Sequence, residues 1–495
     1  MYRLADLLSD VDGARASLNI ENVTVTGVCS DSRSVCPGQV FVCIKGKNND
    51  GSEYIKEAIK RGAIAIVCEG NSSAQCDSVI YVTVTNARSA CARMLSRVYG
   101  DPCSKMKIIA VTGTNGKTTV TKMIENALKE SGKRCAVIGT LGASFENETV
   151  SIATMTTPDP DILYALLAKY ADAGAQYVVM EASSHALALS KLDGMSVEIA
   201  AITNLTAEHL DFHGNMENYY AAKASLFDKC KTGVFLCDDY YTVKMYNESK
   251  CNKVSCSVKD ARWDYHAENV GYSFENGTIF TVAHKGEAFP VHSSVAAEFT
   301  VSNALLAATV LRELGVEAAA IYKGIASLRG VEGRMQRLET QTDFSVYIDF
   351  AHTPDALAKL LESVRKIKKR EERIVTLFGC GGDRDRTKRA LMGAVASHLS
   401  DFVIITEDNS RSEEPSAIID EIMSGFDKSC PHVRIDDREK AIEFAILNAE
   451  KNDIILLCGK GHEKYEIGKN GARPFCESDI VKTALKKRKE RKGDY

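Results

Sequence analysis

One ten-residue segment constrains the fold of this chain more than any other: residues 110–119 are AVTGTNGKTT. An apolar run enters a turn with two glycines, and a helix-forming sequence, TVTKMIENALKE, follows directly. Glycines let backbone N–H groups approach a phosphate, Lys117 can reach its β and γ oxygens, and the Thr118 hydroxyl can ligate Mg²⁺. The usual spacing has a glycine where this chain has Val111, so the segment is a shortened variant. It predicts a strand–loop–helix unit that binds nucleotide phosphates.

The rest of the chain alternates short β-branched runs with longer helical stretches, which is typical of α/β domains with parallel sheets. One helix is expected at 53–61. The expected strands are 39–44, 63–67, 79–84, 177–180, 200–204, 345–350, 373–378, 401–406 and 453–457. Residues 238–297 are irregular and rich in strands. At roughly 100–200 residues per domain, we predict three α/β domains, at 1–100, 101–335 and 336–495.

Composition and charge exclude several classes of protein. The chain has 62 Lys and Arg against 66 Asp and Glu, so no basic excess indicates a nucleic-acid partner. Its apolar runs are far shorter than the roughly 18 residues of a membrane span, and its start lacks the pattern of a signal peptide. The 16 cysteines are scattered without a CxxC pair, which favours reduced thiols over disulfides or zinc. We expect a soluble, cytoplasmic protein without membrane insertion, with the C-terminal KKRKERKGDY as a solvated helix end.

Polar residues follow the expected strands of the second and third domains. Glu181 begins EASSH after one strand, and LTAEHLDFHG, with Glu208 and His209, follows the next. In the third domain, DFAHTPDAL and TEDNSRSEEP also come at strand ends. Ligands bind at the carboxyl ends of parallel strands, and carboxylate beside a phosphate loop can ligate Mg²⁺. Each segment alone is equally compatible with a structural role, but together they predict one site in a cleft between domains.

Two further segments imitate known motifs. The sequence GCGGDRDR resembles a dinucleotide fingerprint, but its spacing differs and its charges suit an anionic group better. The sequence GKGHEKYE lacks the second histidine of a zinc protease. Neither motif changes the prediction.

The order of the motifs resembles that of the Mur ligases. These motifs are TGTNGKTT, EASSHAL, NLTAEHLDFHG, AAKASLF, GRM, DFAHTPDAL, FGCGGDRDRTKR, DNSR and GKGHE. The segment DSRSVCPGQVFVCIKG, residues 31–46, is similar to the first domain of the MurE branch, which adds the third residue of the peptidoglycan stem. The resemblance covers nearly the whole chain. It implies an N-terminal UDP-binding α/β domain, a central ATPase with a parallel sheet, and a C-terminal Rossmann-like domain that binds the amino acid.

The resemblance also implies the reaction and its cofactors, ATP and two Mg²⁺ ions. The γ-phosphoryl group of ATP goes to the D-glutamate carboxylate of UDP-N-acetylmuramoyl-L-alanyl-D-glutamate, and the amine of an amino acid attacks the acyl phosphate. Thr118 and Glu181 would hold one ion, and His209 and Lys223 the other. Lys223 matches the lysine that is carbamylated in this family. The implied catalytic residues are Lys117, Glu181, His209 and Lys223.

The remaining roles carried over by resemblance fall into three groups. The expected ATP-binding residues are Gly113, Thr114, Asn115, Gly116, Lys117, Thr118, Thr119, Asn303, Arg334, Asp349 and His352. The expected contacts of the UDP-linked dipeptide are Ser32, Thr156, Thr157, Ser183 and Lys191. The expected contacts of the incoming amino acid are Arg389, Asp408, Asn409, Arg411, Gly459 and Glu463. Three positions depart from the family pattern: Lys191 replaces an arginine, and Glu332 and Ser410 each replace a proline.

Arg411, at the end of DNSR, indicates meso-diaminopimelate as the amino acid, because a guanidinium can hold the carboxylate that lysine lacks. Glu463 would accept hydrogen bonds from the adjacent ammonium. A structural alternative is a surface ion pair of Arg411 with Glu413 or Glu414. The functional alternatives are L-lysine as substrate, a folylpolyglutamate synthetase-like ligase, and a noncatalytic regulator that binds a UDP-sugar or a nucleotide. We expect small-molecule partners only and a monomer.

Overall fold

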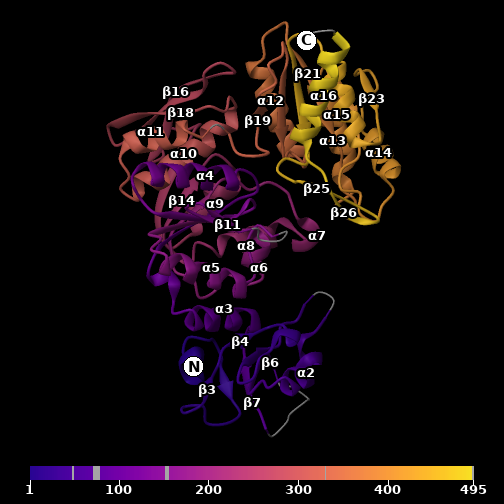
Figure 1. The fold of residues 1–495 in the computed structure, drawn as a ribbon. Coiled ribbons are helices and arrows are strands. Elements are labelled where there is room, and N and C mark those ends of the chain that lie inside the picture. Colours follow the sequence, from indigo (N-terminus) through magenta and orange to yellow (C-terminus); the bar gives the residue numbers. More distant parts are fainter. Residues whose placement is uncertain (47–48, 71–77, 151–154, 329, 493–495) are drawn as a thin grey trace.

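The structure is a computed structural model, and it describes residues 1–46, 49–70, 78–150, 155–328 and 330–492. Figure 1 shows three bodies in a row, with the N-terminus and the C-terminus at opposite ends of the molecule. Each body contains its own main sheet. The predicted α/β class is therefore confirmed.

Within its described residues, the N-terminal body has one five-stranded sheet, in the order β2-β7-β6-β5-β4. The strands are β1 (Tyr2–Arg3), β2 (Arg15–Ala16), β3 (Thr24–Val25), β4 (Val28–Cys29), β5 (Val40–Val42), β6 (Ala65–Glu69) and β7 (Ile80–Val84). The helices are α1 (Leu4–Leu8), η1 (Ser32–Ser34), η2 (Gly51–Tyr54), α2 (Ile55–Lys60) and α3 (Ala87–Val98). The expected helix at 53–61 is divided, because the Asp50 side chain accepts a hydrogen bond from Ser52 N and starts a 3-10 turn.

The central body has an eleven-stranded sheet among the described residues, in the order β11-β10-β9-β12-β8-β13-β14-β15-β16-β17-β18. Its strands are β8 (Lys107–Thr112), β9 (Cys135–Gly139), β10 (Gly142–Phe145), β11 (Glu148–Val150), β12 (Tyr177–Glu181), β13 (Val197–Ile202), β14 (Cys230–Leu236), β15 (Asn252–Ser257), β16 (Tyr265–Ser273), β17 (Gly277–His284) and β18 (Glu287–Ser293). Its helices are η3 (Pro102–Ser104), α4 (Lys117–Glu130), α5 (Pro160–Asp172), α6 (Ser184–Ala188), α7 (Leu210–His213), α8 (Met216–Ala224), α9 (Tyr240–Glu248), α10 (Glu298–Glu313) and α11 (Ala318–Ala326). The strands from β9 through β12, β8, β13, β14 and β15 to β16 are parallel, and antiparallel strands extend both edges.

The C-terminal body has a six-stranded sheet in its described part, in the order β19-β20-β24-β21-β22-β23, with only β19 antiparallel. Its strands are β19 (Gln336–Leu338), β20 (Ser345–Asp349), β21 (Arg373–Phe378), β22 (Phe402–Ile405), β23 (His432–Arg434), β24 (Asp453–Cys458), β25 (Tyr465–Gly468) and β26 (Gly471–Pro474). Its helices are α12 (Pro354–Ile367), α13 (Thr387–Leu399), α14 (Pro415–Ser424), α15 (Arg438–Leu447) and α16 (Glu477–Lys492).

Strand order brings the polar segments of the sequence together. Strands β12, β8 and β13 are neighbours, with Glu181 opposite Val111 and Ile202 opposite Thr112. The segments that follow these strands therefore meet at one edge of the central sheet. Strands β20, β24, β21 and β22 are likewise neighbours and parallel in the C-terminal sheet. Figure 1 shows β25 and β26 on the side of the C-terminal body that faces α7 of the central body.

Candidate active site

The turn between β8 and α4, residues 113–116, is called the phosphate loop below. Gly116 caps α4 with a φ of 88°, and a Cβ there would lie 2.4 Å from Asn303 Oδ1. The Lys117 ammonium donates to two carbonyl oxygens of the loop, at 3.0 and 2.9 Å. Burial lowers the pKa of Lys117, while Glu208 and Glu181 oppose this shift. The loop thus holds a cation inside a turn too tight for any residue but glycine at 116.

Glu181 lies at the carboxyl end of β12 and is fully buried. One of its oxygens accepts a hydrogen bond from the Thr118 hydroxyl at 3.0 Å, and the other accepts one from Thr140 N at 2.8 Å. Among the described residues, no group of three or more His, Cys, Asp or Glu side chains could hold a metal ion. One carboxylate beside one hydroxyl nevertheless suits Mg²⁺, which commonly takes its other ligands from water and phosphate.

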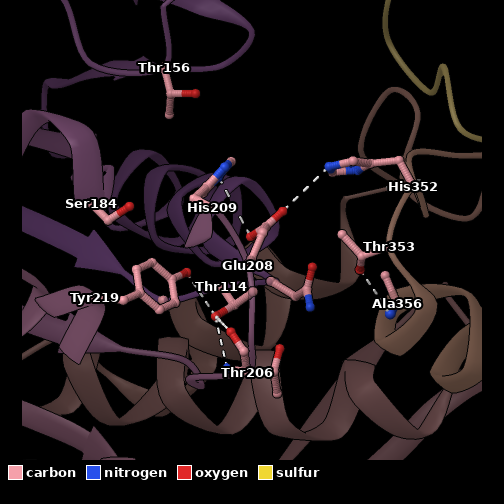
Figure 2. Close-up of polar contacts among 12 residues, drawn as sticks. Thr114, Thr156, Ser184, Thr206, Glu208, His209, Tyr219, His352, Thr353 and Ala356 are labelled. Carbon is pink, nitrogen blue, oxygen red and sulfur yellow. Dashed lines mark hydrogen bonds and ion pairs between the residues drawn. The ribbon is translucent and has the colours of Figure 1, made fainter. Parts of the chain in front are cut away.

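Glu208 and Lys223 follow β13, which flanks β8 on the side opposite β12. The fully buried Lys223 amine donates to the Gly113 carbonyl oxygen at 2.8 Å, and burial lowers its pKa well below the usual value. Glu208 Oε2 lies 3.8 Å from Nε2 of His209, which stands in a left-handed conformation at the start of α7. His209 is about half exposed, so its imidazole is accessible to a ligand. Figure 2 shows Glu208 pointing between His209 and His352.

The C-terminal body contacts this edge of the central sheet directly. His352 Nε2 lies 3.4 Å from Glu208 Oε1. Asp355, in the first turn of α12, accepts hydrogen bonds from Asn115 Nδ2 at 3.3 Å and from the Thr206 hydroxyl at 3.2 Å. Asp355 is not among the residues expected at the site, although it lies inside the DFAHTPDAL motif that provides Asp349 and His352.

The other residues expected around ATP lie on helices of the central body and at the start of the C-terminal body. Asn303 lies on α10 against Gly116, and Thr119 lies in the first turn of α4. Arg334 and Asp349 are at the start of the C-terminal body. The Arg334 guanidinium lies 4.6 Å from the centre of the Phe350 ring, and Asp349 accepts hydrogen bonds from the backbone N–H groups of Met335 and Ala351. Burial raises the pKa of Asp349.

The residues expected to contact the dipeptide lie mainly beside Glu181. The Thr157 hydroxyl donates to the Glu181 carbonyl oxygen at 2.8 Å and lies 3.2 Å from the Ser183 hydroxyl. Thr156 contacts Thr140 at 3.2 Å. Lys191 forms an ion pair with Asp159 at 2.7 Å. Ser32 is buried in η1 of the N-terminal body.

The residues expected to contact the amino acid meet where β22 and β24 end. Asn409 Nδ2 donates to Glu463 at 2.7 Å, and a Cβ on Gly459 would lie 2.7 Å from Asp408. Burial and the neighbouring Asp408 raise the pKa of Glu463. Arg411, with a φ of 52°, donates to the carbonyl oxygens of Gly382 and Asn409. In the described part of the chain, no carboxylate forms a salt bridge with Arg411.

Arg389 differs from the other residues of this group. Its side chain is fully buried and forms ion pairs at 2.8 Å with both Glu413 and Glu421. Glu414 pairs instead with Lys469. The surface pairing of Arg411 with Glu413 or Glu414 is therefore absent from the described residues. Arg389 holds the loop after β22 against α14 in this arrangement.

Comparisons with known proteins identify one family across all three bodies of the chain. The chain matches family models described as "Mur ligase family, catalytic domain" (residues 24–99), "Mur ligase middle domain" (111–311) and "Mur ligase, glutamate ligase domain" (333–461). It is 40% identical to the UDP-N-acetylmuramoyl-L-alanyl-D-glutamate--2,6-diaminopimelate ligase of Caldanaerobacter subterraneus, over 98% of this chain and 99% of that protein. The ligase of the same name from Chlorobaculum tepidum is 38% identical, over 92% of this chain and 90% of its own.

Solved structures give the same result. A structure of a UDP-N-acetylmuramoyl-L-alanyl-D-glutamate--2,6-diaminopimelate ligase matches with a TM-score of 0.69 and 30% identity, covering 95% of this chain and 97% of that one. MurF ligase from Thermotoga maritima in complex with ADP shares the fold, with a TM-score of 0.62 and 20% identity over 95% of this chain and 99% of its own. None of the helices in the described residues is long and apolar enough to cross a membrane.

Proposed function

Because the chain belongs to the Mur ligase family, we propose that it couples ATP cleavage to the joining of meso-2,6-diaminopimelate to UDP-N-acetylmuramoyl-L-alanyl-D-glutamate. Several curated relatives named for this ligation are 35–40% identical to it. One observation carries the proposal at the site itself. The amines of Lys117 and Lys223 both bind the Gly113 carbonyl oxygen, at 3.0 and 2.8 Å, beside the buried Glu181 at the next strand end.

The reaction brings two anions together. The D-glutamate carboxylate attacks the γ-phosphorus, the bond to ADP breaks, and an acyl phosphate forms; the amine of the amino acid then displaces phosphate. Lys117 would swing from the loop carbonyls to the γ-phosphoryl oxygens and offset the repulsion between the two reactants. Gly116 would present its backbone N–H group to the phosphates at the start of α4, whereas the Asn115 N–H group donates to Asn204 Oδ1 at 3.0 Å.

We propose two Mg²⁺ sites. Thr118 and Glu181 suit the first, because a hydroxyl and a carboxylate are already within 3.0 Å of each other. His209 and a carbamylated Lys223 would form the second. The low pKa of Lys223 supports carbamylation, since only the neutral amine adds carbon dioxide. Bound Mg²⁺ would supply positive charge that neutralises phosphate oxygens.

The choice of diaminopimelate rests on Arg411. Its half-buried guanidinium has backbone acceptors but no salt bridge among the described residues, and burial and the nearby Arg384 lower its pKa. Such a cation gains from a carboxylate on the ligand. Asp408, Asn409, Gly459 and Glu463 would surround the rest of the amino acid, with Arg389 supporting the loop that carries Arg411.

The test is ligation and phosphate release from ATP with each substrate omitted in turn. We expect product only with ATP, Mg²⁺, the UDP-linked dipeptide and diaminopimelate together, and at least about tenfold lower kcat/KM with L-lysine. Equal use of the two amino acids would contradict the proposed specificity. Glutamate addition to a folate would identify a folylpolyglutamate synthetase, and binding of the UDP-linked dipeptide without turnover would identify a noncatalytic regulator.

We also propose domain boundaries near residues 100 and 335. The enzyme works as a monomer in the cytoplasm, where ATP and the UDP-linked dipeptide would be available. Ser32 contacts the uridine end of the dipeptide substrate, and Thr156, Thr157, Ser183 and Lys191 contact its peptide part. Asn303, Arg334, Asp349 and His352 surround the nucleotide.

A further inference from the structure

Lys460 is a buried cation beneath the proposed amino-acid pocket. It follows β24, its side chain is 0% exposed, and its ammonium donates to Asn409 Oδ1 and to the Tyr465 carbonyl oxygen, both at 3.0 Å. The same ammonium lies 3.7 Å from Asp408 Oδ1 and 3.9 Å from Glu463 Oε2. Three side chains expected to contact the amino acid thus surround one lysine to which no role has been assigned.

The position of Lys460 determines how Asn409 is oriented. Asn409 Oδ1 accepts from Lys460 and from Ile467 N at 2.9 Å, so its Nδ2 must turn toward Glu463, to which it donates at 2.7 Å. Asp408 accepts from Asn409 N at 2.6 Å. Lys460 therefore holds two carboxylates and one amide in a single arrangement.

The two carboxylates of this cluster share one close ammonium. Arg438, the other fully buried cation nearby, pairs with Glu477 at 2.8 Å and also donates to the Cys458 carbonyl oxygen. Lys460 is then the one close counter-ion, within the described residues, for both Asp408 and Glu463. The Arg411 guanidinium also attracts both carboxylates. Once the far carboxylate of a ligand pairs with Arg411, two carboxylates share one ammonium, and a second ammonium from the ligand would complete the balance.

We propose that Lys460 is a positioning residue that sets amino-acid specificity, by holding Asp408, Asn409 and Glu463 as an acidic receptor for the far-carbon ammonium of a diamino acid. The inference rests on the proposed function and adds a determinant distinct from Arg411. Arg411 would recognise the far carboxylate, whereas the Lys460 cluster would recognise the far ammonium. Without Lys460, two buried carboxylates would face each other unpaired, and one would take up a proton and lose its attraction for the ligand.

The test compares diaminopimelate with 2-aminopimelate, which keeps the far carboxylate and lacks the far ammonium. The wild type should prefer diaminopimelate by about tenfold or more in kcat/KM, since a lost charged hydrogen bond costs about 1.5–3 kcal/mol. In Lys460→Met and Lys460→Gln, the KM for diaminopimelate should rise about tenfold and the preference should shrink. The KM for ATP and for the UDP-linked dipeptide should change little. Lys460→Gln keeps a hydrogen-bond donor while it removes the charge and shortens the side chain.

Lys464→Met is the matched control, because Lys464 is 67% exposed and pairs with Glu332; it should leave every KM unchanged. A lower Tm with unchanged discrimination in the Lys460 variants would overturn the inference, as would an equal rise in the KM of all three substrates. If neither variant folds, equal use of the two amino acids by the wild type would still overturn it. Failure of the wild type to ligate diaminopimelate at all would instead refute the proposed function.

Discussion

At the scale of single residues, the candidate site contains cations whose charge is wholly or partly shielded from water. Lys223 is buried with its amine 2.8 Å from the Gly113 carbonyl oxygen. Arg411 is half-buried and held in a left-handed conformation, where its N–H donates to the Ile467 carbonyl oxygen at 3.0 Å. Strained backbone and unpaired charge are typical of functional positions, because neither stabilises the fold by itself.

Lys223→Ala should lower kcat strongly, because the variant cannot form the carbamate that would ligate the second Mg²⁺. Acetate or formate added in solution should restore part of the activity, since a short carboxylate can occupy the vacated volume. Steady-state ligation rates with and without the carboxylate provide the measurement. Lys231→Ala, at a surface lysine that pairs with Glu198, is the control and should show neither effect. A Lys223→Ala enzyme with full activity would refute the carbamate.

Arg411→Ala should reduce the preference for diaminopimelate over L-lysine by about tenfold or more. In the wild type, bound lysine leaves the guanidinium without a carboxylate partner, at a cost of about 1–3 kcal/mol, and the variant removes this difference. The change should appear mainly in the KM for diaminopimelate. Ratios of kcat/KM for the two amino acids measure it, with Arg262→Ala, at an exposed arginine of the central body, as control. An unchanged kcat/KM ratio would mean that another group binds the far carboxylate.

At the scale of the element, helix α4 shows how local chemistry shapes the phosphate loop. Glycines with positive φ stand at both of its ends: Gly116 at 88° and Gly132 at 74°. They differ in their surroundings, because a Cβ on Gly116 would lie 2.4 Å from Asn303, whereas a Cβ on Gly132 would have no atom within 4 Å. The first glycine is thus required by packing as well as by backbone conformation.

Gly116→Ala should weaken ATP binding by about tenfold or more, because it adds both the strain of a positive φ and a steric clash with α10. Gly132→Ala imposes a comparable backbone strain of about 1 kcal/mol without the clash, so it should lower Tm modestly and leave the ATP Kd unchanged. Titration of a fluorescent ATP analogue distinguishes them. Equal Kd values in the two variants would show that the packing against Asn303 is unimportant.

At the scale of the whole molecule, the central and C-terminal bodies meet at the proposed nucleotide site. Asp355 on α12 accepts hydrogen bonds from Asn115 and Thr206, and His352 approaches Glu208. An ion pair between Lys369 and Glu275, at 2.9 Å, joins the same two bodies farther from the site. The exposed pair is worth little, whereas the partly buried contacts of Asp355 should matter more.

Asp355→Ala should favour separation of the two bodies, because it removes two contacts worth about 0.5–1.5 kcal/mol each. We expect a larger radius of gyration by small-angle X-ray scattering with ATP bound, and a higher KM for ATP. Lys359→Ala removes only the partner of Asp355 on its own helix, so it should change neither quantity. An unchanged radius of gyration in Asp355→Ala would contradict a role in domain contact.

Local sequence was sufficient to predict several strands and the turn that precedes α4. Apolar runs that stop at glycines or polar side chains predict the phosphate loop, the strands β12, β20, β21 and β24, and the position of Glu181 at a strand end. Such patterns depend on near neighbours alone. Strand order is not local information. That Glu181 opposes Val111 across the sheet, and so meets Thr118, required the packed parallel strands.

The same reason separates the expected from the unexpected residues in the C-terminal body. The motifs singled out Asp408, Arg411 and Glu463, but Asp408 lies more than 50 residues from Lys460 along the chain. Their two segments had to pack together before the Lys460 ammonium could approach both Asp408 and Glu463. Packing also placed Glu413 in an ion pair with Arg389, so Arg411 has no carboxylate partner among the described residues. Charge pairing in a folded protein is decided by burial and distance, which act between segments that no local pattern connects.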